Sequence, residues 1–485
     1  METTALFLSD RRQQTVMVLR GSAGTGKTTL AGAIVRAMVA MKQKFVLMAP
    51  TGRAAKVFSL YAGHPAFTIH RRIYRQRTAG LPSFSIPGSS PLTGTMAVFN
   101  LNDNLYHDTL FIIDEASMIA NASTNETFGS GCLLDDLIRY VYSGSNCRML
   151  LIGDKAQLPP VGEEEAPALM TDVLRGYGLI VYECDLNEVL RQSQQSGILF
   201  NATRIRQMIT HDEMTQLPRI CIKGFADICI VPGDELIESI ASSYSHAGIE
   251  ETIVITRSNK RANIYNQGIR RTVLDREEEL CRGDQLMIVK NNYNVNPNTP
   301  LSPPERGKSS VAGRASTNPD LPPSGGLRGV FNGDRCVVQR VRNIHEVYGF
   351  RFADVTIQMP DYDDAELTTT VMLDTLTTEA PALTREQQEQ LYIRVMEDYA
   401  DIPQKTERIR RLKSDTYYNA LQIKFAYAVT CHKAQGGQWA HVYLDQGYMT
   451  DDMLTPDYIH WLYTALTRAT EKVFLVNWPR TQTES

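Results

Sequence analysis

The stretch Val16–Thr28, VMVLRGSAGTGKT, decides the fold of this 485-residue chain. A short apolar run leads into the pattern G-x-x-x-x-G-K-T, and a helix-compatible run, Thr29–Ala40, follows it. In such a strand–loop–helix context the glycines let backbone N–H groups converge on phosphate oxygens, and the helix N-terminus adds positive potential. The sequence therefore predicts a phosphate-binding loop for ATP, made by Gly21, Ser22, Ala23, Gly24, Thr25, Gly26, Lys27, Thr28 and Thr29.

A second apolar run, Phe111–Ile113, ends in two adjacent carboxylates, Asp114 and Glu115. One such acid can hold Mg²⁺ while its neighbour orients or deprotonates the attacking water, and ATP hydrolysis needs both roles. We assign Asp114 to the metal, together with the hydroxyl of Thr28, and Glu115 to the water. Lys27 is expected to reach the β and γ phosphates.

A third candidate element is the loop that follows the apolar run Met149–Gly153. It reads GDKAQLPPVG over residues 153–162. Its Gln157 would place an uncharged amide at the γ-phosphate, where it would sense the ATP-bound state. Read from this sequence alone, Gln157 is equally well an ordinary loop residue.

Short apolar runs bounded by Gly, Pro or Asp recur along the chain and predict an α/β fold. Helical stretches lie between several of them, which indicates a mainly parallel sheet with helices on both faces. The first set is Val16–Leu19, Phe45–Ala49, Leu110–Asp114 and Met149–Gly153. A second α/β unit is expected from the runs Ile253–Thr256, Phe425–Thr430, Val442–Leu444 and Val473–Val476.

Two insertions interrupt these units. Residues 77–108 lose helical periodicity and are rich in proline and glycine, which indicates an inserted loop or hairpin. Further along, a small antiparallel barrel is expected from the alternating runs Gln285–Val289, Arg335–Val341 and Val355–Met359. A charged helix is expected from about Thr384, which stands at capping-box spacing from Gln387.

Within the second insertion, residues 294–327 are rich in Asn, Pro, Ser, Gly and Arg and poor in large apolar residues. That composition is typical of a disordered, solvated linker. The alternative is a basic arm that touches nucleic acid through Arg306, Lys308, Arg314 and Arg328.

The bulk composition excludes several classes of protein. With 43% hydrophobic and 21% charged residues it is that of an ordinary globular protein, and no apolar run approaches the roughly 18 residues that span a bilayer. The eight cysteines lack metal-ligand spacing, so reduced thiols and a cytoplasmic protein without a membrane segment are expected. Because the net charge is −4, any surface that follows nucleic acid must be a local one.

Taken together, these residues resemble the superfamily 1 DNA helicases, specifically the RecD/Dda/Pif-like branch, whose members move 5′ to 3′ on single-stranded DNA. The resemblance covers most of the chain, in the family's order. Its motifs are APTGRAA at Ala49–Ala55, TIHR at 68–71, DEASM at 114–118, GDKAQLPPVG at 153–162, LRQ at 190–192, TCHKAQG at 430–436 and YTALTRA at 463–469.

The resemblance implies two RecA-like P-loop NTPase domains with an inserted β-hairpin pin and an inserted SH3-like β-barrel. Domain 1A would span residues 1–190, with the pin at about 78–107. Domain 2A would combine residues 191–282 and 421–485, and the barrel subdomain 2B would span residues 283–420. Phe84 or Phe99 would be the wedge of the pin, or would pack on a neighbouring domain instead.

The resemblance also implies roles for single residues. Arg191 and Arg468 look like two arginine fingers that reach the γ-phosphate, a role worth about 10³–10⁵ in rate. Gly436 and Gln438 would contact ATP, although relatives often place an acidic residue at the ribose. The residues that grip DNA would be Pro50, Thr51, Arg53, His70, Thr256, Asn259, Thr430, His432 and Lys433.

The resemblance thus implies an ATP- and Mg²⁺-dependent helicase that acts on single-stranded and fork DNA in repair, recombination or replication. A monomer would be sufficient for this activity. Relatives commonly carry an adenine-reading glutamine further upstream than the 20 residues before Gly21, so the adenine contact stays open. Alternative functions are a helicase subunit of a nuclease complex, a translocase that strips proteins from DNA, and an ATP-timed DNA-binding switch.

Overall fold

The computed structural model describes residues 2–10, 12–76, 99–122, 129–186, 196–210, 217–292, 330, 332–362, 364–450 and 453–484. They belong to two compact units, one of residues 1–275 and 427–485 and the other of residues 276–426. The first unit contains two parallel sheets and the second a closed barrel. The segment 294–327 and most of the expected pin lie outside the described residues.

The first sheet has the strand order β3-β2-β6-β7-β1-β8, and all of its neighbouring strands are parallel. The apolar runs expected as strands form its centre, where helices on both faces bury them. Its strands are β1 (Thr15–Gly21), β2 (Lys44–Ala49), β3 (Ala66–Thr68), β6 (Thr109–Ile113), β7 (Arg148–Gly153) and β8 (Ile180–Leu186).

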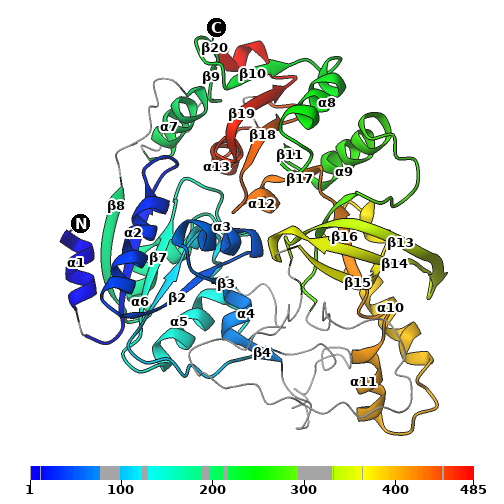
Figure 1. Cartoon of the computed structure of the whole chain (residues 1–485), viewed down its shortest axis with the longest axis horizontal. Helices are drawn as coiled ribbons and strands as arrows, with labels where there is room; N and C mark the ends of the chain where they lie inside the picture. The colour runs from blue at the N-terminus through cyan, green and yellow to red at the C-terminus, as the bar shows by residue number, and fades with distance from the viewer. Residues whose placement is uncertain are drawn as a thin grey trace. The chain divides into compact units, whose positions relative to one another are not determined.

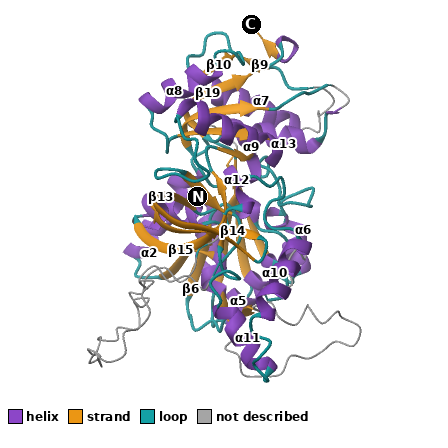
Figure 2. Cartoon of the chain, turned by 90° about the vertical axis from the view of Figure 1, so that its right-hand side faces the viewer, coloured by secondary structure: helices purple, strands orange, loops and turns teal. Residues whose placement is uncertain are grey.

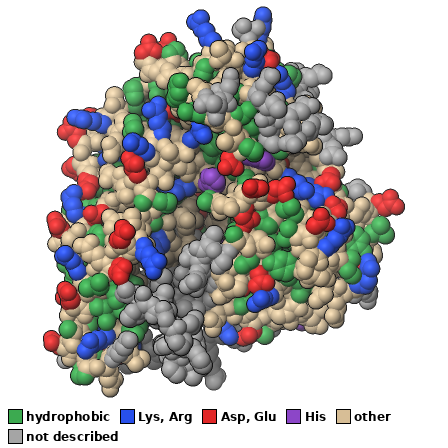
Figure 3. Space-filling view, turned by 180° about the vertical axis from the view of Figure 1, so that it is seen from behind, with side chains coloured by type: hydrophobic (Ala, Val, Ile, Leu, Met, Phe, Trp, Pro, Cys, Tyr) green, Lys and Arg blue, Asp and Glu red, His purple; other side chains and the backbone are tan. Residues whose placement is uncertain are grey.

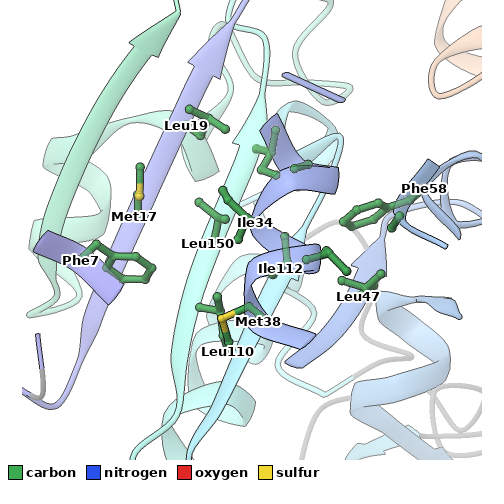
Figure 4. Packing of buried hydrophobic residues seen from close by; sticks show 14 residues of the cluster. Phe7, Met17, Leu19, Ile34, Met38, Leu47, Phe58, Leu110, Ile112 and Leu150 are labelled. Carbon is green, nitrogen blue, oxygen red and sulfur yellow. The ribbon is translucent and has the colours of Figure 1, made fainter. Parts of the chain in front are cut away.

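One face of this sheet packs on α1 and α2 to form a continuous apolar core. Figure 4 shows Met17 and Leu19 of β1 and Leu150 of β7 turned toward Ile34 and Met38 of α2. The helical segments of this half are α1 (Glu2–Ser9), α2 (Lys27–Ala40), α3 (Gly52–Ala62), α4 (Ile69–Ile73), η1 (Ala116–Met118), α5 (Leu133–Ser143), η2 (Pro167–Leu169) and α6 (Thr171–Gly176). Strands β4 (Tyr74–Gln76) and β5 (Phe99–Leu101) pair antiparallel; β4 precedes the expected pin, and β5 lies within its expected bounds of about 78–107.

The second sheet has the order β10-β19-β18-β11-β17, again entirely parallel. Figure 1 shows α7, α8, α9 and α13 around it. Its strands are β10 (Ile228–Val231), β11 (Thr252–Thr256), β17 (Ala428–Thr430), β18 (Trp439–Asp445) and β19 (Ala469–Val476). The remaining elements of this half are α7 (Gly197–Thr210), β9 (Ile220–Cys221), α8 (Leu236–His246), α9 (Asn259–Gly268), η3 (Ile269–Val273), α12 (Cys431–Ala434), α13 (Pro456–Leu466), η7 (Arg480–Gln482) and β20 (Thr483–Glu484).

The second unit is a closed five-stranded barrel, β12-β13-β14-β15-β16, several strands of which are visible in Figure 2. Its pairs are antiparallel except β15 with β16, a parallel pair whose long crossover connection contains two helices. The three runs from which the barrel was expected lie in β12, β13 and β14 and pair antiparallel, as predicted. The elements are β12 (Gln285–Ile288), β13 (Arg335–Val347), β14 (Phe350–Met359), η4 (Pro360–Tyr362), β15 (Ala365–Met372), η5 (Asp374–Leu376), α10 (Arg385–Glu397), α11 (Lys405–Ser414) and β16 (Leu421–Phe425).

Helix α10 begins where its sequence signal predicts. The hydroxyl of Thr384 accepts from the N–H of Gln387, and the Gln387 side chain accepts from the N–H of Thr384. These two bonds satisfy backbone donors that the first turn of a helix leaves without partners.

The run Phe425–Thr430, expected as one strand of the second sheet, is divided between the two units. Phe425 ends β16 and pairs with Leu286 of the barrel, whereas Ala428 begins β17 and pairs with Val254 of the parallel sheet. The barrel unit consequently spans 276–426, compared with the 283–420 delimited from the sequence.

The surface drawn in Figure 3 mixes Lys and Arg side chains with Asp and Glu side chains and shows no large patch of one sign. That mixture agrees with the net charge of −4. Within the part of the chain that the structure describes, no helix combines the length and the apolar character needed to cross a bilayer.

Candidate nucleotide and nucleic-acid site

The loop Gly21–Thr28 closes tightly between β1 and α2. Gly24 and Gly26 have φ angles of 78° and 86°, a left-handed conformation that glycine adopts without strain. A Cβ at Gly21 would lie 2.5 Å from Thr25 Oγ1, so no larger residue fits there. No side chain caps the N-terminus of α2, so its first N–H groups are directed at whatever anion the loop receives.

The amino group of Lys27 lies inside this loop. It donates to the carbonyls of Gly21 at 2.6 Å and Ser22 at 3.0 Å, and Asp154 Oδ2 is 3.8 Å away. The two carbonyls hold the cation over the loop without neutralising it. Phosphate oxygens bound by the loop would therefore meet a positioned positive charge.

The adjacent acids Asp114 and Glu115 follow β6 at the end of the sheet that carries the loop. Glu115 has a left-handed backbone, with φ of 51°, and its N–H donates to Asp114 Oδ1 at 2.9 Å. The hydroxyl of Tyr61, on α3, donates to the other oxygen of Asp114. Burial raises the pKa of both carboxyls, and the charge of Arg468 is the foremost influence that lowers the pKa of Glu115. The pair is thus desolvated but within the field of cations.

Gln157 lies in the loop after β7 and is only 5% exposed. Hydrogen bonds fix the backbone of Gln157. Its N–H donates to the Asp154 carbonyl at 3.2 Å, and a ring nitrogen of His460 contacts the Gln157 carbonyl at 3.2 Å. Its side-chain Oε1 is buried and has no hydrogen-bond partner among the described residues. A buried amide oxygen without a donor is costly, so this group calls for a ligand or water in the site.

Arg468 comes from the second sheet, just before β19, and is 4% exposed. Its guanidinium donates to the carbonyls of Thr464 at 3.0 Å and Gly437 at 3.3 Å and to the hydroxyl of Thr467 at 3.2 Å. Among the described residues these partners are all neutral. A buried cation without a carboxylate partner gains from an approaching anion, and its charge already acts on Glu115 of the first sheet.

Tyr463 of α13 connects the second sheet directly to the phosphate-binding loop. Its hydroxyl accepts from the N–H of Ala23 at 2.9 Å and donates to Asp154 Oδ2 at 2.6 Å. Burial raises the pKa of this hydroxyl well above its usual range, with Asp154 adding to the effect, so it stays protonated at neutral pH. The loop, the segment after β7 and α13 therefore share one chain of hydrogen bonds.

The residues expected to hold Mg²⁺ fit that ion chemically. Thr28 is exposed at the start of α2, beside the equally exposed Thr29, and its hydroxyl has no partner among the described residues. Hydroxyl and carboxylate oxygens are ligands that Mg²⁺ accepts, and the ion commonly takes one or two of them together with substrate phosphates. The described residues contain no cluster of three or more His, Cys, Asp or Glu side chains, so a cage built from protein alone is not present there.

The turn after α12, which holds the expected ATP contacts Gly436 and Gln438, meets α3. Gly436 has φ of 73°, and Gln438 has an exposed side chain while its carbonyl accepts from Arg53 at 2.5 Å. The guanidinium of Arg53 also stacks on the ring of Trp439, 4.2 Å from its centroid. Arg53, expected to grip DNA, is therefore engaged in contacts between the two halves of the unit.

Two residues expected at DNA, Thr430 and His432, line a cavity of 280 Å³. Its walls come from the loop after β7, from the ends of β11 and β17, and from α13. The other lining residues are Leu158, Pro159, Pro160, Val161, Gly162, Glu163, Arg257, Cys431, Asp457, Tyr458 and Trp461. Apolar and polar groups thus face one another in this cavity.

Other residues expected at DNA use their polar groups within the fold. Thr51 caps α3 by accepting from the N–H of Ala54 at 3.2 Å, and the buried Thr256 donates to the Ser258 carbonyl at 3.0 Å. Burial lowers the pKa of His70 to about 4, so this ring is neutral at pH 7. The remaining residues of that set, all half-buried, are Pro50 before α3, Asn259 at the start of α9 and Lys433 in α12.

Some expected site residues are not placed. Arg191 and Phe84 lie outside the described residues, and Phe99 is described only through the backbone of β5. Conversely, Tyr61 and Arg206 contact the site, at Asp114 and at Ser22, and sequence reasoning missed both. Neither stands in a recognisable motif, because each acts through a partner remote in the chain.

Comparisons with known proteins match two parts of this chain. Residues 7–215 match the family described as an AAA domain, and residues 425–476 match the UvrD-like helicase C-terminal domain. The chain is 31% identical over 160 residues to the ATP-dependent RecD2 DNA helicase of Deinococcus radiodurans, covering 33% of this chain and 18% of that protein. It is 25% identical over 282 residues to the ATP-dependent DNA helicase dda of Enterobacteria phage T4, covering 56% of each.

These matches leave much of each relative uncovered. The chain spans 18% and 56% of the length of the two curated proteins. Among solved structures, Bacteroides Pif1 bound to single-stranded DNA is 15% identical with a TM-score of 0.45, covering 100% of this chain and 94% of that one. Because a TM-score of 0.45 carries no argument for the fold, the fold assignment depends on the strand order and register described above.

Proposed function

We propose that this chain, a member of the RecD/Dda/Pif-like branch of the superfamily 1 helicases, is an ATP-dependent DNA helicase that moves 5′ to 3′ on single-stranded DNA. Residues 1–190 would form domain 1A. The barrel unit, residues 276–426, would form subdomain 2B, and domain 2A would combine residues 191–275 and 427–485. The enzyme would act as a cytoplasmic monomer on single-stranded and fork DNA, in repair, recombination or replication.

The observation that carries this proposal is the buried guanidinium of Arg468. It comes from the second sheet, its charge acts on Glu115 just after the first sheet, and all its described hydrogen-bond partners are neutral. An arginine so placed can neutralise the charge that develops on a transferred phosphoryl group. Since it belongs to a different sheet from the phosphate-binding loop, hydrolysis becomes sensitive to how the two sheets meet.

The other residues take the following roles in this proposal. Lys27 and the loop amides bind the phosphates, Glu115 accepts a proton from the attacking water, and the free amide oxygen of Gln157 orients that water or senses the γ-phosphate. Thr28 and Asp114 would hold Mg²⁺, which supplies neutralisation of phosphate charge when bound. Tyr61 keeps the Asp114 carboxylate in position through its hydrogen bond.

Coupling to DNA follows from the same contacts. Tyr463 and His460 of α13 contact Asp154 and Gln157 in the loop after β7, and the next residues of that loop line the cavity with Thr430 and His432. A change at the nucleotide would therefore alter one wall of the DNA groove. Contacts in such a groove position a strand without reading its sequence, so little sequence specificity is expected.

The number of ATP molecules hydrolysed per encounter with a strand tests this proposal against an ATP-timed binding switch. The protein is preloaded on oligo-dT, and ATP is added with a trap that captures every molecule that dissociates. We expect many turnovers per encounter, increasing with the length of the oligo-dT, because a motor spends ATP at each step. A single turnover that is independent of length would refute the motor.

A further inference from the structure

Arg206 of α7 contacts the phosphate-binding loop, although no sequence pattern predicted it there. Its Nη1 donates to Ser22 Oγ at 2.9 Å, across 184 residues of sequence. Its charge partly offsets the rise that burial causes in the pKa of Tyr463, whose hydroxyl accepts from the N–H of Ala23. The guanidinium therefore lies beside Ser22, the second residue of the loop.

Among the described residues, no carboxylate neutralises the charge of Arg206. Its hydrogen bond there goes to the neutral hydroxyl of Ser22. Arg204, two residues earlier on the same helix, behaves differently. It forms a two-pronged ion pair with Glu484, with distances of 2.7 and 2.9 Å. Helix α7 thus carries one arginine satisfied by an acid and one directed at an anion-binding loop.

Hydrogen-bonding capacity supports the same conclusion. A guanidinium has five N–H donors in a rigid fork, and the contact with Ser22 uses one of them. Two parallel donors of this kind suit phosphate oxygens particularly well. Because the side chain is half-buried, such a contact would be less screened than one in open solvent.

We propose that Arg206 contacts the phosphate chain of the bound nucleotide as a further cationic ligand beside Lys27 and Arg468. This inference rests on the proposed function, since it places one more residue in the same ATP site. Arg206 would report the nucleotide to α7, the first helix described after the segment that contains Arg191. The competing explanation is that Arg206 only fastens α7 to Ser22 through one neutral hydrogen bond.

Three substitutions separate these explanations. Arg206→Gln keeps a donor for Ser22 but removes the charge, Arg206→Lys keeps the charge but loses the fork, and Arg206→Met removes both. Arg204→Met is the matched control, since it removes a neighbouring arginine of the same helix that is engaged with Glu484. The dissociation constant of the non-hydrolysable analogue AMP-PNP with Mg²⁺ is measured by calorimetry for each full-length protein, and thermal unfolding without nucleotide checks each fold.

We expect Arg206→Gln and Arg206→Met to weaken AMP-PNP binding by about tenfold to a hundredfold, the usual range for a lost hydrogen bond to a charged group. Arg206→Lys should lose less, and Arg204→Met should bind like the wild type. The proposal is overturned if Arg206→Gln binds as tightly as the wild type, or if Arg204→Met loses as much as Arg206→Gln. Either result would leave the proposed function standing, whereas a wild-type protein that does not bind AMP-PNP would remove both.

Discussion

Replacing Arg468 with alanine is expected to lower the rate of DNA-stimulated ATP hydrolysis at saturating ATP by about 10³–10⁵. The guanidinium is buried, has neutral described partners and acts on Glu115, so its main contribution should appear when charge develops on the transferred phosphoryl group. ATP binding should weaken less than turnover. Steady-state turnover and AMP-PNP affinity, measured on the same preparation, separate the two effects.

The control for this prediction is Arg139→Ala, which removes an arginine that is mostly exposed and paired with Asp135 on α5. It should hydrolyse ATP at the wild-type rate. Because Arg468 also bonds two carbonyls of its own half, Arg468→Lys is made in parallel to retain a buried cation. If both Arg468 variants fold and keep turnover within tenfold of the wild type, Arg468 is not an arginine finger.

Replacing Lys27 with alanine is expected to lower ATP turnover by about 10²–10³, in the range found when one positioned donor to a developing anion is removed. The variant loses the cation that two loop carbonyls hold over the phosphate site. AMP-PNP affinity should fall as well, since the ground-state phosphates also meet this charge. Colorimetric phosphate release with and without oligo-dT measures turnover.

Lys223→Ala serves as the comparison, because Lys223 is exposed in a turn of the second half. Its turnover should equal that of the wild type. If Lys27→Ala retained DNA-stimulated ATP turnover, Gly21–Thr28 would not be the hydrolytic site. The roles assigned to Asp114, Glu115 and Gln157 would then be wrong as well.

Much of the fold was predictable because its central strands are covered on both faces and read as apolar runs. The edge strands β8 and β10 were not predicted, since an edge strand has one partner and less need for a continuous apolar run. Residues 425–430 looked like one strand because periodicity carries no sign of a change of partner. The division at Ala426 depends on pairing with Leu286 and Val254, which are remote in sequence.

The residues of the candidate site also fall into two groups, those that the sequence could predict and those that it could not. Lys27, Asp114 and Glu115 stand in local patterns with a chemical reason, so sequence alone could propose them. Tyr61 and Arg206 reach Asp114 and Ser22 from separate helices, and no spacing along the chain reports such contacts. Thr256 was assigned to DNA through the family resemblance alone, and its hydroxyl bonds a backbone carbonyl inside the fold, so its contact with DNA stays a prediction.

The most direct test of the account is strand separation on matched substrates. Three duplexes of one sequence are compared, carrying a 5′ single-stranded tail, a 3′ tail or no tail, each with the wild type and with Lys27→Ala. We predict ATP-dependent separation of the 5′-tailed duplex by the wild type and none by Lys27→Ala. Equal or faster separation of the 3′-tailed duplex would contradict the polarity, and rapid ATP turnover without separation of any duplex would contradict the helicase and favour a translocase.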